Sequence, residues 1–520
     1  MWKKIVSKLG FPSRGHDLLI LSVPFVFPAC PPIGPAILKA QLKKHGYSCD
    51  VWDLNIELYH LRGFRHIFES DYDAFMFAPA TSASYFKEFY DENLKSIVRN
   101  WAERVCAARP RVLGLSLFSD RSAYMAERIV HEVKACGFSG RIVLGGPFAH
   151  ILIKNPDMRS YFPSGIDIIA GEAELSILSY MKGKLDYPGI NSEPVQLENL
   201  DLIPIPEYTR NQFKKYDRID GNKRAYITAS RGCVRRCTFC DVRNLWPKYR
   251  YRSARSVFNE MIHLHEKFGR REFKFTDSLI NGNLKMLIEL CELLVEYKSR
   301  ERFRWGGQFI CRSRSSMPPK VFQLLADAGC RYVSIGVESG SERVRAHMRK
   351  GFSNEDLFYT LEQLNKVGIA VNLLMLIGYL TESEEDFEQT LQFFTQCKER
   401  GLFHKPERWA CIQSVILGGT LAVHRNTEVY EILESEGIPV PSPQQWTYNG
   451  LDRMTRLERL FRAMIHIHDL GFGDLLQGQT GGRYGFLWNE FREYKKFDRV
   501  NPEVIERISR FFKNKVGDHD

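Results

Sequence analysis

The order of apolar and polar positions divides the first 190 residues into alternating strands and helices. Short apolar runs, typical of strands buried on both faces of a parallel sheet, occur at 17–23, 47–53, 111–118, 141–147 and 167–174. Apolar residues recur at helical spacing between these runs, at 33–42 and 124–136. This alternation predicts an α/β fold with a doubly wound sheet, which binds ligands at the carboxyl ends of its strands.

The same alternation resumes at residue 223 and continues to about residue 420. Strands are predicted at 225–230, 272–277, 303–310, 332–338, 370–378 and 407–416. Ser353 and Ser383 each precede an aspartate by three residues, which is typical of a helix start. Six strand-helix units are too few for an eight-stranded barrel. They predict a partial, TIM-like (β/α)6 barrel with its active groups at the carboxyl rim of the strands.

The remaining segments set the expected domain boundaries. Residues 191–222 have little periodicity and are interpreted as an extended linker between a domain at 1–190 and the barrel at 223–420. Residues 421–520 have a helical, aromatic-rich pattern and are interpreted as a small C-terminal domain. An insertion between about residues 58 and 109 is expected to form helical cover for the first sheet.

Composition indicates a reducing compartment and no membrane span. The chain has 520 residues, of which 44% are hydrophobic and 26% charged, as in ordinary globular proteins. Its twelve cysteines lack even spacing, which favours free thiols and a cytoplasmic location. The longest uncharged run, at 18–38, contains too many prolines for a continuous helix. The net charge is +11, but the basic residues are scattered among acidic ones rather than gathered in blocks. Nucleic acid is therefore an unlikely partner.

A loop with three closely spaced cysteines follows the first strand of the predicted barrel. Cys233, Cys237 and Cys240 form a CxxxCxxC pattern with an aromatic residue, Phe239, just before the last cysteine. Three thiolates on one tight loop can hold an iron-sulfur cube and leave its fourth iron open to a ligand. A zinc knuckle or three unrelated buried cysteines are the alternatives, although zinc usually takes four ligands and no second CxxC pair follows the loop.

This loop resembles the signature of radical S-adenosylmethionine (SAM) enzymes. The resemblance implies that Cys233, Cys237 and Cys240 hold a 4Fe-4S cluster whose open iron chelates SAM. One electron would then cleave SAM to methionine and a 5′-deoxyadenosyl radical.

Several positions at the predicted rim match the same resemblance. It implies SAM contacts for Phe239, Asp277, Gln308, Arg312, Glu338, Ser339 and Lys350. The alternative is structural: a loop cap at Asp277, a solvated ion pair at Arg312 and a packing role for Glu338. The segment 377–382 departs from the family, since it reads IGYLTE where GxPGET is usual.

The first domain resembles cobalamin-binding domains. Ser116-Leu117-Phe118 and then Gly145-Gly146 match the SxL and GG motifs, and Gly34 stands in the PPxG sequence common in cobalamin-binding radical SAM proteins. The resemblance implies cobalamin contacts for Gly34, Asp53, Ser116, Gly145, Gly146, Gly171 and Glu172. Pro31 replaces the histidine that ligates cobalt in other members. The alternative is a Rossmann-like domain that has lost its ligand.

Three functions follow from these resemblances. The first is a class B radical SAM methyltransferase that methylates an unactivated carbon through methylcobalamin. The second is a non-methylating relative that uses cobalamin in cyclisation, ring contraction or hydroxylation, and the third is a non-catalytic cluster and corrinoid sensor. A small-molecule or peptide substrate is expected, together with an external reductant of the flavodoxin or ferredoxin type.

Overall fold

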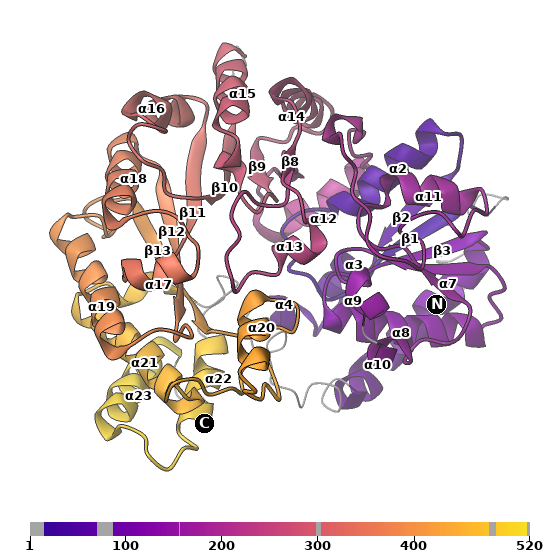
Figure 1. Ribbon diagram of the computed structural model, residues 1–520. Coiled ribbons are helices and arrows are strands. Elements are labelled where there is room, and N and C mark those ends of the chain that lie inside the picture. The colour runs from indigo at the N-terminus through magenta and orange to yellow at the C-terminus, as the bar shows by residue number, and fades with distance from the viewer. Residues whose placement is uncertain (1–14, 70–86, 155, 298–302, 478–484, 517–520) are drawn as a thin grey trace. The chain divides into compact units, whose positions relative to one another are not determined.

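The computed structural model describes residues 15–69, 87–154, 156–297, 303–477 and 485–516 (Figure 1). The chain forms two compact units. Unit 1 comprises Met1–Phe68 and Pro79–Asn222, and unit 2 comprises Glu69–Ala78 and Lys223–Asp520. Unit 2 thus contains both the predicted barrel segment and the C-terminal segment.

Unit 1 is built on a five-stranded parallel sheet in the order β2-β1-β3-β4-β5. Its strands are β1 (Leu18–Ser22), β2 (Cys49–Asp53), β3 (Val112–Ser116), β4 (Arg141–Gly145) and β5 (Ile166–Ile168). The strand order reverses between β1 and β3, so the carboxyl ends of these two strands flank the topological switch point. This arrangement confirms the predicted doubly wound α/β sheet.

Helices cover both faces of this sheet. They are α2 (Ile33–Lys44), α3 (Leu54–His60), α4 (Arg65–Glu69), α7 (Lys95–Ala108), α8 (Asp120–Ala135), α9 (Ala149–Lys154), α10 (Pro156–Arg159) and α11 (Ala173–Met181), with a π-helical turn at Tyr90–Leu94. Of the predicted insertion at 58–109, residues 70–86 lie outside the described residues, and the described remainder is mainly helical.

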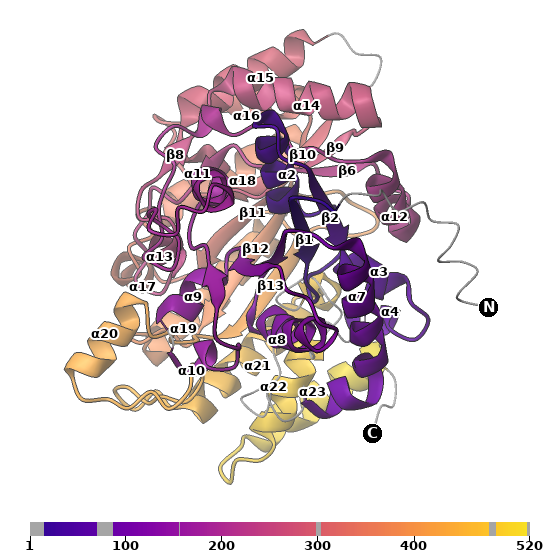
Figure 2. The same ribbon diagram turned by 90° about the vertical axis from the view of Figure 1, so that its right-hand side faces the viewer.

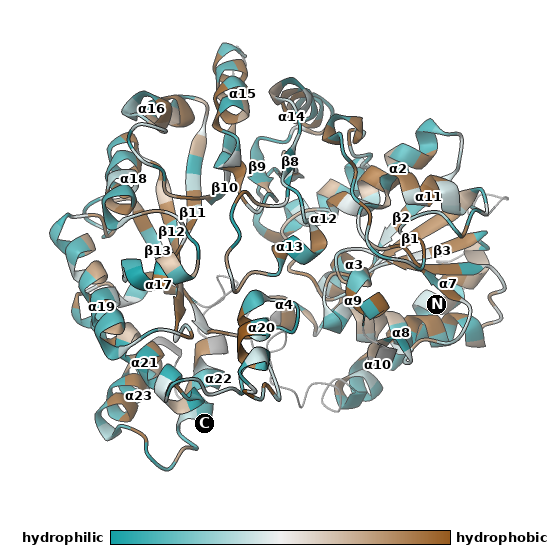
Figure 3. Cartoon of the chain, in the orientation of Figure 1, coloured by the Kyte–Doolittle hydropathy of each residue, from teal (hydrophilic) through white to brown (hydrophobic). Residues whose placement is uncertain are grey.

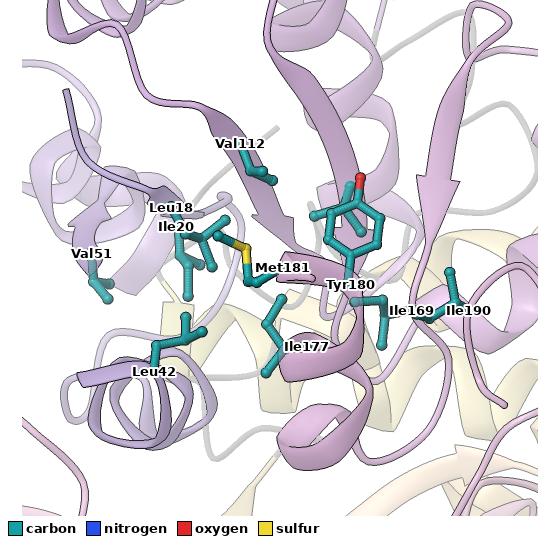
Figure 4. Close-up of a cluster of buried hydrophobic side chains, with 11 residues drawn as sticks. Leu18, Ile20, Leu42, Val51, Val112, Ile169, Ile177, Tyr180, Met181 and Ile190 are labelled. Carbon is teal, nitrogen blue, oxygen red and sulfur yellow. The ribbon is translucent and has the colours of Figure 1, made fainter. Parts of the chain in front are cut away.

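One hydrophobic cluster joins the sheet to two of these helices (Figure 4). Leu18 and Ile20 of β1 meet Ile177 and Met181 of α11, with Leu42 of α2 beside them. Leu18 and Leu42 are at most 1% exposed, and burying each side chain contributes about 1.5–3 kcal/mol. The cluster therefore holds α2 and α11 against one face of the sheet.

The predicted linker contains a helix that the periodicity did not reveal. Helix α12 spans Arg210–Asp220, begins with a capping box between Thr209 and Gln212 and ends at Gly221 in the left-handed conformation. Only Phe213 and Tyr216 on it are buried. Two apolar positions in an otherwise polar stretch give a weak periodic signal, but the caps at both ends are sufficient to define the helix.

Unit 2 is built on a seven-stranded sheet in the order β14-β13-β12-β11-β10-β9-β6, with every pairing parallel. The strands are β6 (Arg224–Ile227), β9 (Glu272–Phe275), β10 (Arg304–Phe309), β11 (Cys330–Glu338), β12 (Ala370–Ile377), β13 (Ile412–Thr420) and the two-residue β14 (Leu476–Gln477). The six longer strands correspond to the six predicted, which confirms the partial (β/α)6 barrel.

Helices follow the strands and lie along the outer side of the sheet (Figure 1). They are α14 (Ala254–Phe268), α15 (Leu284–Glu296), α16 (Pro319–Asp327), α18 (Asn354–Val367) and α19 (Glu384–Glu399), and the short α17 (Glu342–His347) follows β11 ahead of α18. Ser353 and Ser383 form the capping boxes of α18 and α19 as predicted. Polar residues face outward on these helices, whereas the strands between them are mostly apolar (Figure 3).

The C-terminal helices pack onto the barrel rather than forming a separate compact unit. They are α20 (Glu428–Ser435), α21 (Arg453–Asp469), α22 (Gly485–Tyr494) and α23 (Pro502–Val516), and the last three lie together in Figure 2. Arg459 of α21 donates to the buried carboxyl of Glu382 at 3.1 Å, just after β12. Arg456 of α21 donates to the Trp446 carbonyl and stacks 3.6 Å from the ring centroid of that residue.

No helix among the described residues is both long enough and apolar enough to cross a bilayer.

Candidate active site at the cysteine loop

A short antiparallel strand pair closes the base of the cysteine loop. Ser230 and Arg231 form the two-residue strand β7, which pairs antiparallel with β8 (Arg250–Tyr251). Gly232 follows β7 with a φ of +85°, and a Cβ there would lie 2.5 Å from the Lys248 carbonyl oxygen. Only glycine fits this position, because both the conformation and the close backbone approach exclude a side chain.

Asp277 anchors the loop at its entrance. Its carboxylate, 2% exposed, accepts hydrogen bonds from the Ala229 backbone N–H at 3.0 Å and the Ser230 hydroxyl at 2.5 Å. Burial raises the pKa of this carboxyl to about 6, although the hydrogen bonds from Ser230 and Ala229 favour the charged form. Asp277 therefore caps the loop entrance, and the SAM contact expected of it stays a prediction.

Thr238, inside the cysteine motif, is held by three other segments. Its N–H donates to the Met348 carbonyl at 3.3 Å, and its own carbonyl accepts from the Val429 N–H at 3.1 Å. Its hydroxyl lies 2.6 Å from the hydroxyl of Tyr379, which lies 2.8 Å from Nδ1 of His347. Every polar group of this residue is therefore used to fix the loop.

The three cysteines are free thiols on this fixed loop, and each is partly buried. Burial raises the pKa of the Cys237 thiol, which Lys350 opposes, and it raises the pKa of Cys240 to about 11. Both shifts favour the protonated thiol in the absence of a metal. The aromatic Phe239 between them contacts Tyr379 edge to face at 6.5 Å.

In the described part of the chain, no three or more His, Cys, Asp or Glu side chains lie close enough to hold one metal ion. A 4Fe-4S cube takes each thiolate on a different iron, so it requires a wider spacing of its ligands than a single ion does.

A buried ion pair lies beside Cys237. Glu338 at the end of β11 accepts from Lys350 at 3.0 Å, and both side chains are at most 13% exposed. Both charges act on the pKa of Cys237, so the pair and the thiol are neighbours. Glu338 adopts a φ of +67°, an unusual conformation for a residue other than glycine. The strain keeps its carboxylate at the carboxyl rim.

Two arginine side chains, those of Arg235 and Arg312, also lie near the loop. Arg312, just after β10, donates to the backbone carbonyls of Asn281 at 2.7 Å and Gly282 at 3.2 Å. Burial lowers the pKa of Arg312, and Arg235 of the cysteine loop lowers it further. Arg235 donates to the Gly351 carbonyl at 3.0 Å. Two cations thus lie close together near Cys233.

Two other predicted SAM contacts differ in their surroundings. Ser339 is fully buried, and its hydroxyl lies 3.3 Å from that of Thr390 and accepts from the Ser341 N–H, so its polar atoms serve the turn after β11. Gln308 lies on β10 and is half-buried.

The predicted cobalamin residues in unit 1 fall into two groups. Those of the first group are engaged by the chain itself. A Cβ on Gly146 would lie 2.4 Å from the Leu117 carbonyl oxygen, and one on Gly171 would lie 2.5 Å from that of Val195. Glu172 accepts from the Leu197 N–H at 2.5 Å. Asp53 caps α3 and accepts from the hydroxyl of Tyr216 at 2.7 Å.

The second group borders open space or the switch point. A Cβ on Gly34 would meet nothing within 4 Å, and one on Gly145 would meet only the Ile169 carbonyl oxygen at 3.8 Å. Ser116 ends β3 at the switch point. Beyond the carboxyl ends of β1 and β3, Phe27 and Phe118 are 46% and 55% exposed.

Sequence reasoning missed the residues that hold the loop. His347 and Val429 belong to no motif, and Thr238 occupies a position of the cysteine motif whose residue type the motif does not specify. The contacts that Thr238 makes with Tyr379 and Val429 are distant in sequence. The sequence did carry a signal for Tyr379, because this residue stands in the segment that departs from the usual GxPGET turn.

Comparisons with known proteins agree with this geometry. The radical SAM superfamily profile matches residues 227–394. An uncharacterized methyltransferase of Pyrococcus horikoshii is 27% identical over 305 residues, which cover 55% of this chain and 64% of the relative. The match therefore spans less than two thirds of the length of that relative.

Two solved structures share the fold. The radical SAM methyltransferase TsrM of Kitasatospora setae, with cobalamin and a [4Fe-4S] cluster bound, has a TM-score of 0.60 at 16% identity, over 81% of this chain and 75% of that one. The cobalamin-dependent SAM radical enzyme OxsB has a TM-score of 0.64 at 14% identity, over 97% and 76%. Residues 227–394 therefore form a radical SAM domain, and the chain has the fold of these two cobalamin-dependent enzymes.

Proposed function

We propose that the protein is a cobalamin-dependent radical SAM enzyme that methylates an unactivated carbon of a small molecule or peptide. Cys233, Cys237 and Cys240 would hold a 4Fe-4S cluster, which when bound supplies the electron that cleaves SAM to a 5′-deoxyadenosyl radical. The superfamily match and the fixed loop of three free thiols support this assignment.

The observation that carries the proposal is the ion pair beside Cys237. An amino-acid ligand such as the methionine end of SAM brings one carboxylate and one amino group. Lys350 can pair with the first and Glu338 can accept a hydrogen bond from the second, so the buried pair exchanges its own contact for two with the ligand. Both groups lie at the carboxyl rim of the barrel, where this fold places its chemistry.

Unit 1 is proposed to bind cobalamin, which when bound supplies the methyl group. The doubly wound sheet offers its switch point between β1 and β3, and Phe27 and Phe118 expose apolar surface just beyond these strand ends. The open surroundings of Gly34 leave room for a ligand. Because Pro31 replaces the histidine, this loop provides no imidazole for cobalt.

Product analysis tests the reaction. Protein reconstituted anaerobically with iron, sulfide, cobalamin and SAM, and reduced with flavodoxin or ferredoxin, is expected to yield 5′-deoxyadenosine and S-adenosylhomocysteine by mass spectrometry. The non-methylating alternative has support from OxsB, which is described as a radical enzyme rather than a methyltransferase. It would yield 5′-deoxyadenosine alone, and a sensor would yield neither product.

A single-cysteine variant tests the division between the two cofactors. Cys237→Ala is expected to lose the brown cluster absorbance and SAM cleavage while still retaining corrinoid after gel filtration. Cys136→Ala removes an exposed cysteine of unit 1 and should retain all three properties. Loss of corrinoid together with the cluster in Cys237→Ala would contradict the proposed separation of the sites.

A further inference from the structure

Tyr379 provides the side-chain hydroxyl that reaches into the cysteine motif from the end of β12. The residue is fully buried, and its ring contacts Phe239 at 6.5 Å and His347 at 5.5 Å, both edge to face. Its hydroxyl lies between the Thr238 hydroxyl at 2.6 Å and His347 Nδ1 at 2.8 Å. The ring and the hydroxyl therefore both contact the segment between Cys237 and Cys240.

The direction of these hydrogen bonds follows from the tautomer of the histidine. Burial and the charges of Arg343 and Arg349 lower the pKa of His347, which favours the neutral imidazole. In the tautomer that carries its proton on Nε2, the Tyr379 hydroxyl donates to His347 and accepts from Thr238, and in the other tautomer both bonds reverse. A histidine outside the loop thus orients the tyrosine that holds the loop.

We propose that Tyr379 is a positioning residue for the cluster ligands. Through Thr238 it fixes the backbone between Cys237 and Cys240 and, through its ring, the side chain of Phe239. The backbone bonds of Thr238 to Met348 and Val429 hold the same segment. Among the residues that the structure describes, Tyr379 is the hydrogen-bond partner of the threonine hydroxyl. This inference rests on the proposed cluster role of the cysteines.

The first test uses the protein without its cluster. Tyr379→Phe keeps the ring and removes both hydrogen bonds, and Thr238→Val removes the partner hydroxyl. Alkylation of Cys237 and Cys240 by iodoacetamide, followed by peptide mass spectrometry, is expected to be roughly tenfold faster in both variants, as the loss of buried hydrogen bonds implies. The buried Cys411, just before β13, serves as the internal reference and should keep its rate.

The second test uses the reconstituted protein. Both variants are expected to give an altered electron paramagnetic resonance spectrum of the reduced cluster and faster loss of iron to a chelator. Thr238→Ser keeps the hydroxyl and should restore the wild-type spectrum and the wild-type alkylation rates. A merely structural tyrosine would lower thermal stability without changing the spectrum.

Tyr494 provides the matched control. It is fully buried like Tyr379, and its hydroxyl has two partners, the Asn501 N–H at 2.9 Å and the Glu458 carboxylate at 3.3 Å. Tyr494→Phe should lower stability and leave the spectrum and the alkylation rates unchanged.

Wild-type rates and spectra in Tyr379→Phe and Thr238→Val would overturn the inference. Failure of the wild type to take up a cluster would instead refute the proposed function. The alkylation rates would still test whether Tyr379 holds the loop through Thr238.

Discussion

Asp277 illustrates how a buried carboxyl can have a structural role at a position where a ligand contact is also predicted. The structure shows the first role through the contacts with Ala229 and Ser230, and the ligand contact stays a prediction. The same is true of Ser339, whose hydroxyl has Thr390 and the Ser341 N–H as partners. Sequence motifs locate such residues at the rim, but they do not show which way a side chain points.

The pKa of Asp277 predicts a dependence of stability on pH. Because burial raises this pKa from 3.8 to about 6, the folded state binds the proton more tightly than the unfolded state does. The contribution of this group to the free energy of unfolding is therefore greatest below pH 3.8 and falls by at most about 3 kcal/mol as the pH rises to 6.

The Asp277→Asn variant should not show this decrease in the free energy of unfolding. Urea unfolding of the wild type and the variant without cluster, measured between pH 4 and about 6.5, is expected to give curves that diverge across this window. Parallel curves would contradict a buried, titrating carboxyl at this position. The amide also cannot accept both hydrogen bonds of the loop entrance unchanged, so the variant should take up less iron on reconstitution.

At the scale of elements, the cysteine loop depends on the closure formed by β7 and β8. Gly232→Ala places a methyl group 2.5 Å from the Lys248 carbonyl oxygen and also strains the backbone, whereas Gly269→Ala meets nothing within 4 Å at a similar positive φ. Gly269→Ala is expected to cost about 1 kcal/mol of stability. Gly232→Ala should cost roughly 2 kcal/mol more.

The comparison of these two alanine variants separates backbone strain from closure of the loop. Iron content per chain after reconstitution is expected to fall in Gly232→Ala and to stay at the wild-type value in Gly269→Ala. Equal iron content in both variants would show that the cysteine loop tolerates an open base.

Long, strongly patterned elements were predictable, and weakly patterned ones were not. Strands such as β3 and β12 are fully or alternately buried and therefore leave a continuous or regular apolar signal. Helix α12 buries only Phe213 and Tyr216 and depends on its caps, so its periodicity is faint. The two-residue strands β7 and β8 are shorter than any sequence period and are stabilised by contacts of their surroundings.

At the scale of the whole chain, α21 connects the C-terminal segment to the barrel through buried arginines. Burial raises the pKa of Glu382 to about 7, and the charge of Arg459 opposes this rise. Arg459→Met would leave the carboxyl buried without its cation, at a cost of about 3–5 kcal/mol in the free energy of unfolding.

A second substitution should recover much of this loss. Glu382→Gln combined with Arg459→Met removes both charges, so the double variant is expected to be more stable than Arg459→Met alone. Urea midpoints of the protein without cluster measure the difference. A double variant no more stable than the single one would show that Arg459 acts through packing and not through its charge.

The contacts of Thr238 with Tyr379 and Val429 also have a consequence for biosynthesis. The cysteine motif leaves the ribosome early, but Tyr379 follows Thr238 by 141 positions, and Val429 comes later still. Because domains form largely in the order of translation, the nascent cysteines emerge before the groups that hold them. We therefore expect iron and sulfide to be delivered after Val429 has been synthesised, and a ribosome-stalled fragment that ends before Tyr379 to take up less iron than the full chain.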